Sequence, residues 1–328
     1  MNDGSLLSVQ GLKKHFLLKR SKLLGPRERV YAVDGVSFEL RTGETLGLVG
    51  ESGCGKSTLG RTILHLIDPT AGKIFFEDRD ITNLKPAELK PLRARMQIIF
   101  QDPYSSLNPR LTVENIVGDA LKTHGLAGGD EVPERVAAML DKVGIHREKM
   151  RCFPHEFSGG QRQRIGIARA LILRPKLIIC DEPVSALDVS IQAQVINLLG
   201  DLKKEFQLSY ILIAHDLSVV NHVSDRIAVM YLGKVIELTT KKKLLTRPLH
   251  PYTQALMSAV PVLDPDKKKT RIILKGDVPS PVNPPPGCRF HPRCFKAMEV
   301  CSRVEPLWAE VEPEHFAMCH LYGACQPK

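Results

Sequence analysis

Short apolar runs alternate with helix-like patterns along the first two-thirds of the chain. This alternation is typical of a mostly parallel α/β domain. Four short apolar runs predict buried strands: Thr45–Gly50, Gln97–Phe100, Leu177–Asp181 and Tyr210–Ala214. Ahead of them, Leu7–Leu18 and Val30–Leu40 predict an antiparallel pair joined by a basic loop that contains Gly and Pro.

Two further patterns complete this domain. Residues from about 102 to 170 lack strand-like runs and carry helical periodicity, as in Val132–Val143, so they predict a helical insertion. The segment Ile227–Leu238, with Gly233-Lys234 near its middle, predicts a closing hairpin.

The pattern changes after Leu245. Prolines from Pro279 to Pro286 exclude a regular helix or a central strand there and indicate a stiff, extended lead-in to a cysteine-rich end. We therefore expect an α/β domain over residues 1–245 and a small, irregular C-terminal extension over 246–328.

Composition and charge restrict the class of protein. With 328 residues, 43% hydrophobic and 25% charged, the chain is long enough for one large domain and a smaller one. No apolar run approaches the ~18 residues that cross a bilayer, and lysines interrupt the N-terminal apolar residues, so we expect a cytosolic chain. The net charge of +10 suits anionic partners, although scattered surface lysines would give the same value.

A phosphate-binding loop is predicted between the first buried strand and the following helix. The segment Gly50–Ser57 has the pattern Gly, four residues, then Gly-Lys-Ser. Its glycines let backbone N–H groups turn toward phosphate oxygens, Lys56 adds a full charge, and the Ser57 hydroxyl can ligate Mg²⁺. The residues predicted to bind the nucleotide are Gly50, Ser52, Gly53, Cys54, Gly55, Lys56, Ser57 and Thr58. A chance glycine-rich turn is disfavoured by the strand–loop–helix context.

Paired acids end the strand Leu177–Asp181. Open α/β sheets place ligands at the carboxyl ends of their strands. Asp181 is predicted to hold Mg²⁺, and Glu182, the next residue, to polarise the attacking water. A strand that merely ends in solvated acids is the competing interpretation, and the upstream phosphate loop disfavours it.

A second helix N-terminus that could bind an anion narrows the class of protein. Phe157-Ser158-Gly159-Gly160-Gln161 precedes a helix and lies upstream of Asp181. One domain rarely needs two such termini for one nucleotide, whereas two domains facing head to tail would use both. With this segment the chain resembles the nucleotide-binding subunits of ABC transporters over residues from about 5 to 240; the family's usual leucine is Phe157 here, and the Ser-Gly-Gly-Gln chemistry is intact.

The resemblance assigns roles to further residues. It implies that Gln101 senses metal and attacking water, that Asp188 belongs to the loop communicating across a dimer, and that His215 contacts the terminal phosphate. The signature residues Ser158, Gly160 and Gln161 would reach the ATP of a partner subunit. The adenine-stacking ring would be Phe16, with Tyr31 as the alternative. The implied activity is ATP hydrolysis in a dimer that closes on ATP and reopens on phosphate release.

The C-terminal extension points to a transporter subfamily. The segment Arg247–Thr253 and the cysteines after it are similar to the extension of oligopeptide and dipeptide importer ATPases. The implied partners are a second homologous ATPase subunit, two transmembrane permease subunits and a solute-binding protein, with no nucleic acid. The subunit would be peripheral, at the cytoplasmic face of the inner membrane. Nickel and glutathione importers are close relatives of this subfamily, so the cargo stays open.

Four cysteines of the extension are candidate metal ligands. Cys288, Cys294, Cys301 and Cys319 would offer thiolates either to Zn²⁺ or to an iron–sulfur cluster. Their spacing lacks the tight pairs of zinc fingers, and together with the family resemblance it favours [4Fe–4S] over zinc or free thiols. Cys325 is interpreted as a spare, and His291, His315 and His320 as surface histidines that could replace a ligand.

A different class of function stays open beside the importer. A soluble ABC ATPase acting on nucleic acid or the ribosome would suit the positive charge. Such proteins usually carry two cassettes or a long coiled-coil insertion, whereas this chain predicts one cassette and an insertion of ordinary length.

Overall fold

The computed structural model describes residues 4–18, 27–259 and 271–322. The chain divides into two compact units, each described below by itself. The strand-rich unit contains Leu46–Thr82, everything from His215 onward, and the chain up to Leu40. The helix-rich unit contains Arg41–Thr45 and Asn83–Ala214. Cys325 lies outside the described residues.

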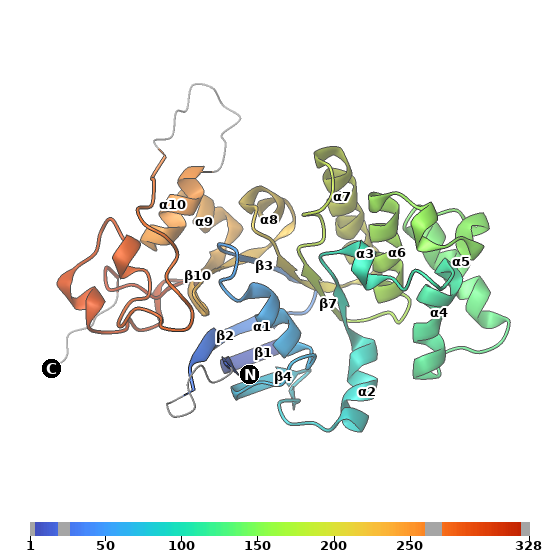
Figure 1. Cartoon of the computed structure of the whole chain (residues 1–328), viewed down its shortest axis with the longest axis horizontal. Coiled ribbons are helices and arrows are strands. Elements are labelled where there is room, and N and C mark those ends of the chain that lie inside the picture. The colour runs from blue at the N-terminus through green and yellow to red at the C-terminus, as the bar shows by residue number, and fades with distance from the viewer. Residues whose placement is uncertain (1–3, 19–26, 260–270, 323–328) are drawn as a thin grey trace. The chain divides into compact units, whose positions relative to one another are not determined.

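The strand-rich unit opens with a four-stranded sheet in the order β2, β1, β4, β5 (Figure 1). Its strands are β2 (Arg29–Arg41), β1 (Ser5–Leu17), β4 (Ala71–Phe76) and β5 (Arg79–Asp80). β1 pairs antiparallel with β4, placing Leu7 opposite Phe76 and Val9 opposite Ile74. These apolar side chains are buried and form the inner face of the sheet. The two long N-terminal strands predicted from alternation are thus present and are neighbours.

The same unit contains the strand that precedes the phosphate loop. β3 (Thr45–Val49) pairs parallel with β9 (Arg226–Tyr231), and β9 pairs antiparallel with β10 (Lys234–Thr240). Leu232 and Gly233 make the two-residue turn with φ of 42° and 80°, so the predicted closing hairpin is confirmed. Around these strands lie α1 (Lys56–Ile63), α8 (Leu217–Val223), α9 (Lys241–Thr246) and α10 (Pro251–Ala259).

The chain after α10 returns to this sheet. From residue 271 it is irregular through two short 3₁₀ turns, His291–Arg293 and Glu299–Ser302, and then forms β11 (Ala309–Glu312) and β12 (His315–Ala317). β12 pairs antiparallel with β10, and β11 with β12. The proline-rich stretch has no regular helix or strand, as predicted. The predicted boundary at residue 245 falls inside α9.

The helix-rich unit places three parallel strands side by side: β6 (Met96–Ile99), β7 (Leu177–Asp181) and β8 (Ser209–Ile213). All five residues of β7 and all five of β8 are buried, which explains their uninterrupted apolar sequences. The predicted helical insertion is present as helices α3 to α6. The helices of this unit are α2 (Pro86–Arg95), α3 (Pro103–Ser106), α4 (Val113–His124), α5 (Glu131–Lys142), α6 (Gly159–Leu171) and α7 (Val189–Phe206), with 3₁₀ turns at Arg147–Arg151 and Pro154–Glu156.

One helix is shorter than its apolar pattern predicts. The spacing of Leu59, Ile63, Leu64 and Ile67 predicts a helix after the phosphate loop that reaches Ile67, but α1 ends at Ile63. His65 has a positive φ of 52°, and the Leu66 N–H donates to the carbonyl of Arg61, so the chain turns there. Leu64 keeps the helical spacing because it packs in the core after the helix has ended.

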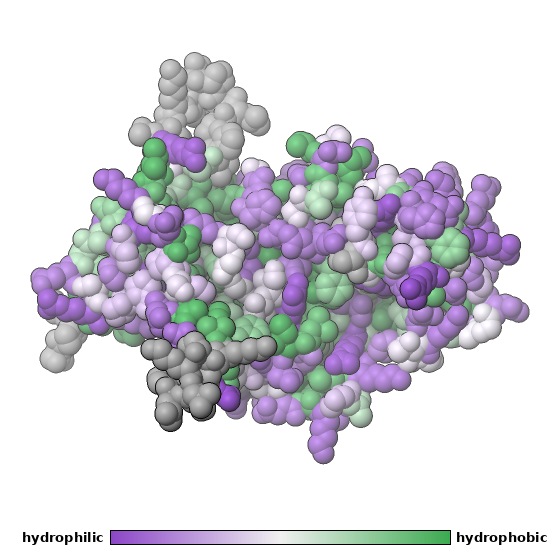
Figure 2. All heavy atoms as spheres, viewed as in Figure 1, coloured by the Kyte–Doolittle hydropathy of each residue, from purple (hydrophilic) through white to green (hydrophobic). Residues whose placement is uncertain are grey.

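Among the described residues, no helix is both long enough and apolar enough to span a bilayer. On the face in Figure 2, hydrophilic residues predominate and hydrophobic ones form small clusters between them.

Candidate functional site

The phosphate loop lies between β3 and α1 in the strand-rich unit. The Lys56 ammonium donates hydrogen bonds to the carbonyls of Gly50 at 2.7 Å and Glu51 at 3.1 Å. Lys56 is only 4% exposed, so its charge is held by loop carbonyls. Ser52 and Gly53 are exposed, whereas Ser57 and Thr58 on the first turn of α1 are half-buried. The loop therefore directs its lysine inward.

Two residues of the loop are fixed by close packing. Gly55 has φ of +107° and caps α1, and a Cβ placed there would lie 1.9 Å from the carbonyl oxygen of Ala32. Cys54 is buried, and burial raises the pKa of its thiol. A protonated, enclosed thiol suits a small space-filling side chain rather than a reactive group.

The two carboxylates, Asp181 and Glu182, lie at the end of β7 in the helix-rich unit. Asp181, the last residue of β7, is fully buried. Glu182 follows in a left-handed conformation, φ 49°, which non-glycine residues rarely adopt. Its carboxylate Oε2 accepts a hydrogen bond of 2.9 Å from the Gln101 side-chain amide. Because Gln101 follows β6, the pairing of β6 with β7 brings together these two residues, whose strands were predicted separately.

The signature segment forms the start of α6 in the same unit. Ser158 is the N-cap: its hydroxyl accepts from the Gln161 N–H at 3.3 Å, and its own N–H donates to the Gln161 side chain at 3.1 Å. This reciprocal capping fixes the first turn of the helix. Gly160 lies half-buried within it, and Asp188 caps α7 from an exposed position.

His215 and the two candidate aromatic rings belong to the strand-rich unit. His215 is exposed and follows β8 in the chain, one residue before the Asp216 cap of α8. Phe16 is 37% exposed, with the Lys14 ammonium 5.0 Å from its ring centroid. Tyr31 instead packs edge-on against the His15 ring at 4.6 Å. Of the two rings, Phe16 is the one with a broad exposed face.

The four candidate ligand cysteines cluster in the C-terminal segment. They are free thiols, and Cys301 and Cys319 are buried. Burial first, and then the thiols of Cys288, Cys294 and Cys301, raise the pKa of Cys319 to about 12. The pKa of Cys288 is raised to about 11, again by burial first. The four sulfurs therefore lie within electrostatic range of one another.

These four thiols do not form a preformed metal-ion site. Among the described residues, no three His, Cys, Asp or Glu side chains form a group that could hold a metal ion. The [4Fe–4S] cluster therefore stays a prediction. A backbone N–H from Lys296 reaches the Cys294 sulfur at 3.4 Å, the kind of hydrogen bond that tunes such clusters.

The three histidines considered as replacement ligands are all engaged elsewhere. Nδ1 of His291 lies 2.9 Å from the carbonyl oxygen of Cys288, and Nε2 of His320 lies 2.8 Å from that of Val304. The prediction of a surface histidine is wrong for His315, which is fully buried and hydrogen-bonded to Glu237 at 2.8 Å. The cause is tertiary: β12 carries His315 onto β10, where Glu237 lies.

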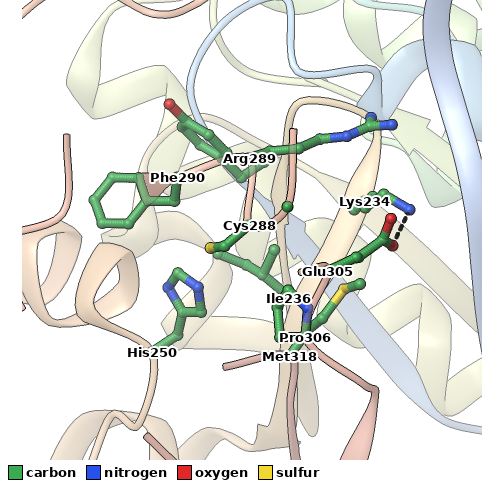
Figure 3. Close-up of a pocket in the computed structure, with 11 residues that line it drawn as sticks. Lys234, Ile236, His250, Cys288, Arg289, Phe290, Glu305, Pro306 and Met318 are labelled. Atoms are coloured by element: carbon green, nitrogen blue, oxygen red, sulfur yellow. Dashed lines mark hydrogen bonds and ion pairs between the residues drawn. The ribbon is translucent and has the colours of Figure 1, made fainter. Parts of the chain in front are cut away.

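A small pocket lies beside Cys288, lined by Tyr231, Ile236, His250, Phe290 and Met318 among others (Figure 3). The Cys288 sulfur lies between the Phe290 ring and His250 in this view. Burial lowers the pKa of His250 to about 4, so its imidazole is neutral there at pH 7. The wall of the pocket is thus mostly apolar around the thiol.

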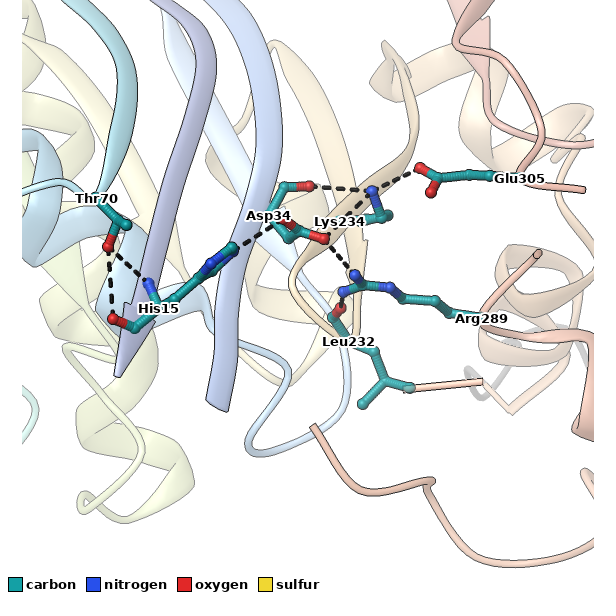
Figure 4. Close-up of polar contacts among 7 residues, drawn as sticks. All are labelled: His15, Asp34, Thr70, Leu232, Lys234, Arg289 and Glu305. Atoms are coloured by element: carbon teal, nitrogen blue, oxygen red, sulfur yellow. Dashed lines mark hydrogen bonds and ion pairs between the residues drawn. The ribbon is translucent and has the colours of Figure 1, made fainter. Parts of the chain in front are cut away.

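Sequence patterns missed the contacts between the C-terminal segment and the nucleotide loop. Arg293 forms a two-pronged ion pair with Glu51 of the phosphate loop. Figure 4 shows a second pair, between Arg289 and Asp34. Lys234, on β10, also contacts Asp34 and pairs with Glu305 at 2.6 Å. The cations of this network hold the pKa of Asp34 below its usual value, although burial opposes them. In the sequence, the only local sign of these contacts is that Arg289 and Arg293 each stand next to a candidate ligand cysteine.

Two family descriptions match the chain. Residues 33–185 match the family described as ABC transporter, and residues 236–301 match the family described as oligopeptide/dipeptide transporter, C-terminal region. The first match spans the phosphate loop, the signature segment and the paired acids.

Relatives and solved structures agree with these matches. The oligopeptide transport ATP-binding protein AppF of Bacillus subtilis is 54% identical over 98% of this chain and 99% of its own length. OppF of Escherichia coli is 54% identical over 92% of each chain. The ATP-binding cassette MJ0796, solved as a dimer with ADP and phosphate, is 28% identical with a TM-score of 0.64, over 72% of this chain and 98% of that one. The chain therefore belongs to the ABC transporter family of ATP-binding subunits.

Proposed function

We propose that this chain is the ATP-hydrolysing subunit that energises import of dipeptides or oligopeptides across the cytoplasmic membrane. The match of residues 236–301 to the oligopeptide/dipeptide transporter C-terminal region is the observation that carries this proposal. Relatives named as oligopeptide transport proteins, aligned over nearly the full chain, support it. The proposed partners are a second ATPase subunit, two permease subunits and a solute-binding protein, with the chain peripheral at the cytoplasmic face.

The proposed roles divide between the two units. In the strand-rich unit, Lys56 and the loop N–H groups bind the phosphates, Phe16 stacks on adenine and His215 contacts the terminal phosphate. In the helix-rich unit, Glu182 polarises the attacking water and Gln101 orients its carboxylate. Ser57 and Asp181 are the residues that would hold Mg²⁺, which neutralises charge on the phosphates.

Residues of the signature segment have a different proposed target. Ser158, Gly160 and Gln161, with Asp188, would contact the ATP bound by the partner subunit. The capped, ordered start of α6 suits this role, because its N-terminal N–H groups and dipole favour an anion. ATP bound at the interface would thus hold two subunits together until its hydrolysis.

Co-purification and stimulation test the proposed transport function. An affinity-tagged chain isolated from its host's membranes should retain two polytopic membrane proteins and a second ATPase. In proteoliposomes, ATP hydrolysis should rise several-fold when the solute-binding protein is loaded with peptide. Stimulation by nickel or glutathione instead would reassign the cargo. Stimulation by nucleic acid, without membrane partners, would favour a soluble ABC ATPase.

We also propose that Cys288, Cys294, Cys301 and Cys319 hold a [4Fe–4S] cluster. The proximity of the four thiols, their enclosure and the N–H donated to Cys294 support it. Residues 246–328 would then be an extension organised around this cluster. Zinc binding and free thiols are the alternatives.

Metal analysis after anaerobic purification tests the cluster. We expect about four iron atoms per chain and broad visible absorption. Cys301→Ser should lose both, whereas Cys152→Ser, a half-buried thiol outside the cluster, should keep them. A colourless wild-type protein that contains zinc and no iron would contradict the proposal.

A further inference from the structure

Glu51 of the phosphate loop is held through three of its groups: the N–H, the carbonyl and the carboxylate. Its N–H donates to the Tyr252 hydroxyl at 2.8 Å. Its carbonyl accepts from the Lys56 ammonium at 3.1 Å. Its carboxylate accepts from both terminal nitrogens of Arg293, at 2.8 and 3.2 Å. Two of these partners, Tyr252 and Arg293, come from the chain after residue 245, so the C-terminal segment sets the conformation of a loop 242 residues away from Arg293.

The hydrogen bond between Tyr252 and Glu51 is supported by a buried aromatic cluster. Tyr252 is fully buried, and its ring packs on Tyr231 at 4.8 Å and on Phe290 at 5.4 Å between centroids. Phe290 lies three residues before Arg293 and also contacts Tyr231, at 5.3 Å. The aromatic cluster of Tyr231, Tyr252 and Phe290 therefore fixes the Tyr252 hydroxyl that accepts from the Glu51 N–H. It also fixes the backbone that carries Arg293.

The ion pair between Arg293 and Glu51 is enclosed and has one fixed geometry. Its side chain is 9% exposed and that of Glu51 is 27% exposed, so solvent screens the pair only weakly. Parallel N–H···O bonds from one guanidinium fix direction as well as distance. Exposed surface pairs of this chain, such as Arg303 with Glu299, lack such enclosure.

A second arginine of the C-terminal segment, Arg289, also links that segment to the phosphate loop. Arg289 contacts the carboxylate of Asp34 and the carbonyl of Leu232, and the Asp34 N–H donates to the Gly233 carbonyl at 2.8 Å (Figure 4). The Gly233 N–H in turn donates to the carbonyl of Cys54 in the phosphate loop. The short segment from Cys288 to Cys294 thus contacts the loop through two separate chains of hydrogen bonds.

From these contacts we propose that Arg293 is a positioning residue of the ATP site, which holds the phosphate loop in its binding conformation through Glu51. The C-terminal segment is then part of the nucleotide-binding machinery rather than an appendage beside it. The inference rests on the proposed function, because it assumes that ATP binds at this loop.

The expected effect is on ATP affinity rather than on the chemical step. Without Arg293, the loop must be ordered at the expense of binding free energy, and the Glu51 carboxylate is left unpaired close to the phosphate groups. Both changes weaken ATP binding. Glu182 and Gln101, which belong to the other unit, keep their contact. A change in KM with an unchanged kcat is the signature of binding that is lost equally in the ground and transition states.

Steady-state kinetics on the full chain test the inference. Arg293→Ala should raise the KM for ATP roughly tenfold, the factor expected for a charged hydrogen-bonded pair, with kcat unchanged. Arg293→Lys keeps the charge but loses the two-pronged geometry, and should recover part of the loss. Glu51→Gln removes the same ion pair without truncating Arg293, serves if Arg293→Ala fails to fold, and should also raise KM because the loop is less well ordered. Arg303→Ala is the matched control and should leave KM at the wild-type value.

Direct binding separates two kinds of failure. Competition against a fluorescent ATP analogue measures ATP affinity without turnover. If the wild-type chain binds no ATP, the proposed function fails. If the wild type binds ATP and Arg293→Ala or Glu51→Gln binds it equally well, only the positioning role is overturned. A lower kcat with unchanged KM in Arg293→Ala would also overturn it.

Discussion

Replacing Glu182 with glutamine is expected to slow ATP hydrolysis by roughly 10²–10⁴-fold while ATP binding is retained. The amide keeps the size of the side chain and can still meet Gln101, but it cannot accept a proton from water. The backbone at Glu182 is left-handed, with φ of 49°, a conformation that non-glycine residues adopt rarely and that recurs at functional sites. Phosphate release and ATP affinity, measured on the same preparation, check the two halves of this expectation.

A matched control for Glu182→Gln is Glu205→Gln, in the same unit. Glu205 is exposed and pairs with Lys142 at the surface, so its replacement should leave turnover within the wild-type range. If Glu182→Gln hydrolyses ATP as fast as the wild type, the general base is a different group and the proposed assignment is wrong.

Gly55→Ala is expected to abolish ATP binding. An added Cβ would lie 1.9 Å from the Ala32 carbonyl oxygen, and the residue's φ of +107° is one that side chains rarely adopt. Backbone on both sides would have to move, and with it the start of α1 and Lys56. ATP affinity measured by equilibrium binding, with a melting curve to confirm folding, tests this outcome.

Gly53→Ala isolates the steric part of the Gly55 effect. Gly53 also has a positive φ, +78°, but a Cβ added there would meet no atom within 4 Å among the described residues beyond its chain neighbours. Backbone strain is thus present in both variants, and the clash in only one. We expect Gly53→Ala to lose at most about tenfold in affinity, since strain in such a region amounts to ~1–3 kcal/mol and part of it relaxes. Equal losses in the two variants would contradict the steric argument.

Local patterns were sufficient for much of the fold. The strands β3 and β7 and the hairpin at Leu232–Gly233 were predictable because burial and turn chemistry act over a few adjacent residues. The end of α1 was not, since Leu64 keeps the helical spacing of its buried face after the backbone has turned. A pattern of burial records which side chains are inside, and only indirectly where the hydrogen bonds of a helix stop.

The same distinction between local and long-range contacts decides which parts of the site could be predicted. The phosphate loop and the acids after β7 are visible in sequence because each is a contiguous segment. The ion pair of Arg293 with Glu51 and the burial of His315 against Glu237 depend on segments far apart in the chain. No local periodicity encodes such pairs, because they exist only once β12 has docked on β10 and the C-terminal segment has reached the loop.

The docking of β12 on β10 has a consequence for how such a protein can change over time. An unpartnered β10 would present a row of open backbone N–H and C=O groups, the kind of edge that recruits other chains. It would also leave Glu237 buried in the sheet without His315. Loss of β12 would therefore expose a strand edge and remove the hydrogen bond between Glu237 and His315 at the same time. A version of this chain without β12 would accordingly need compensating changes in β10.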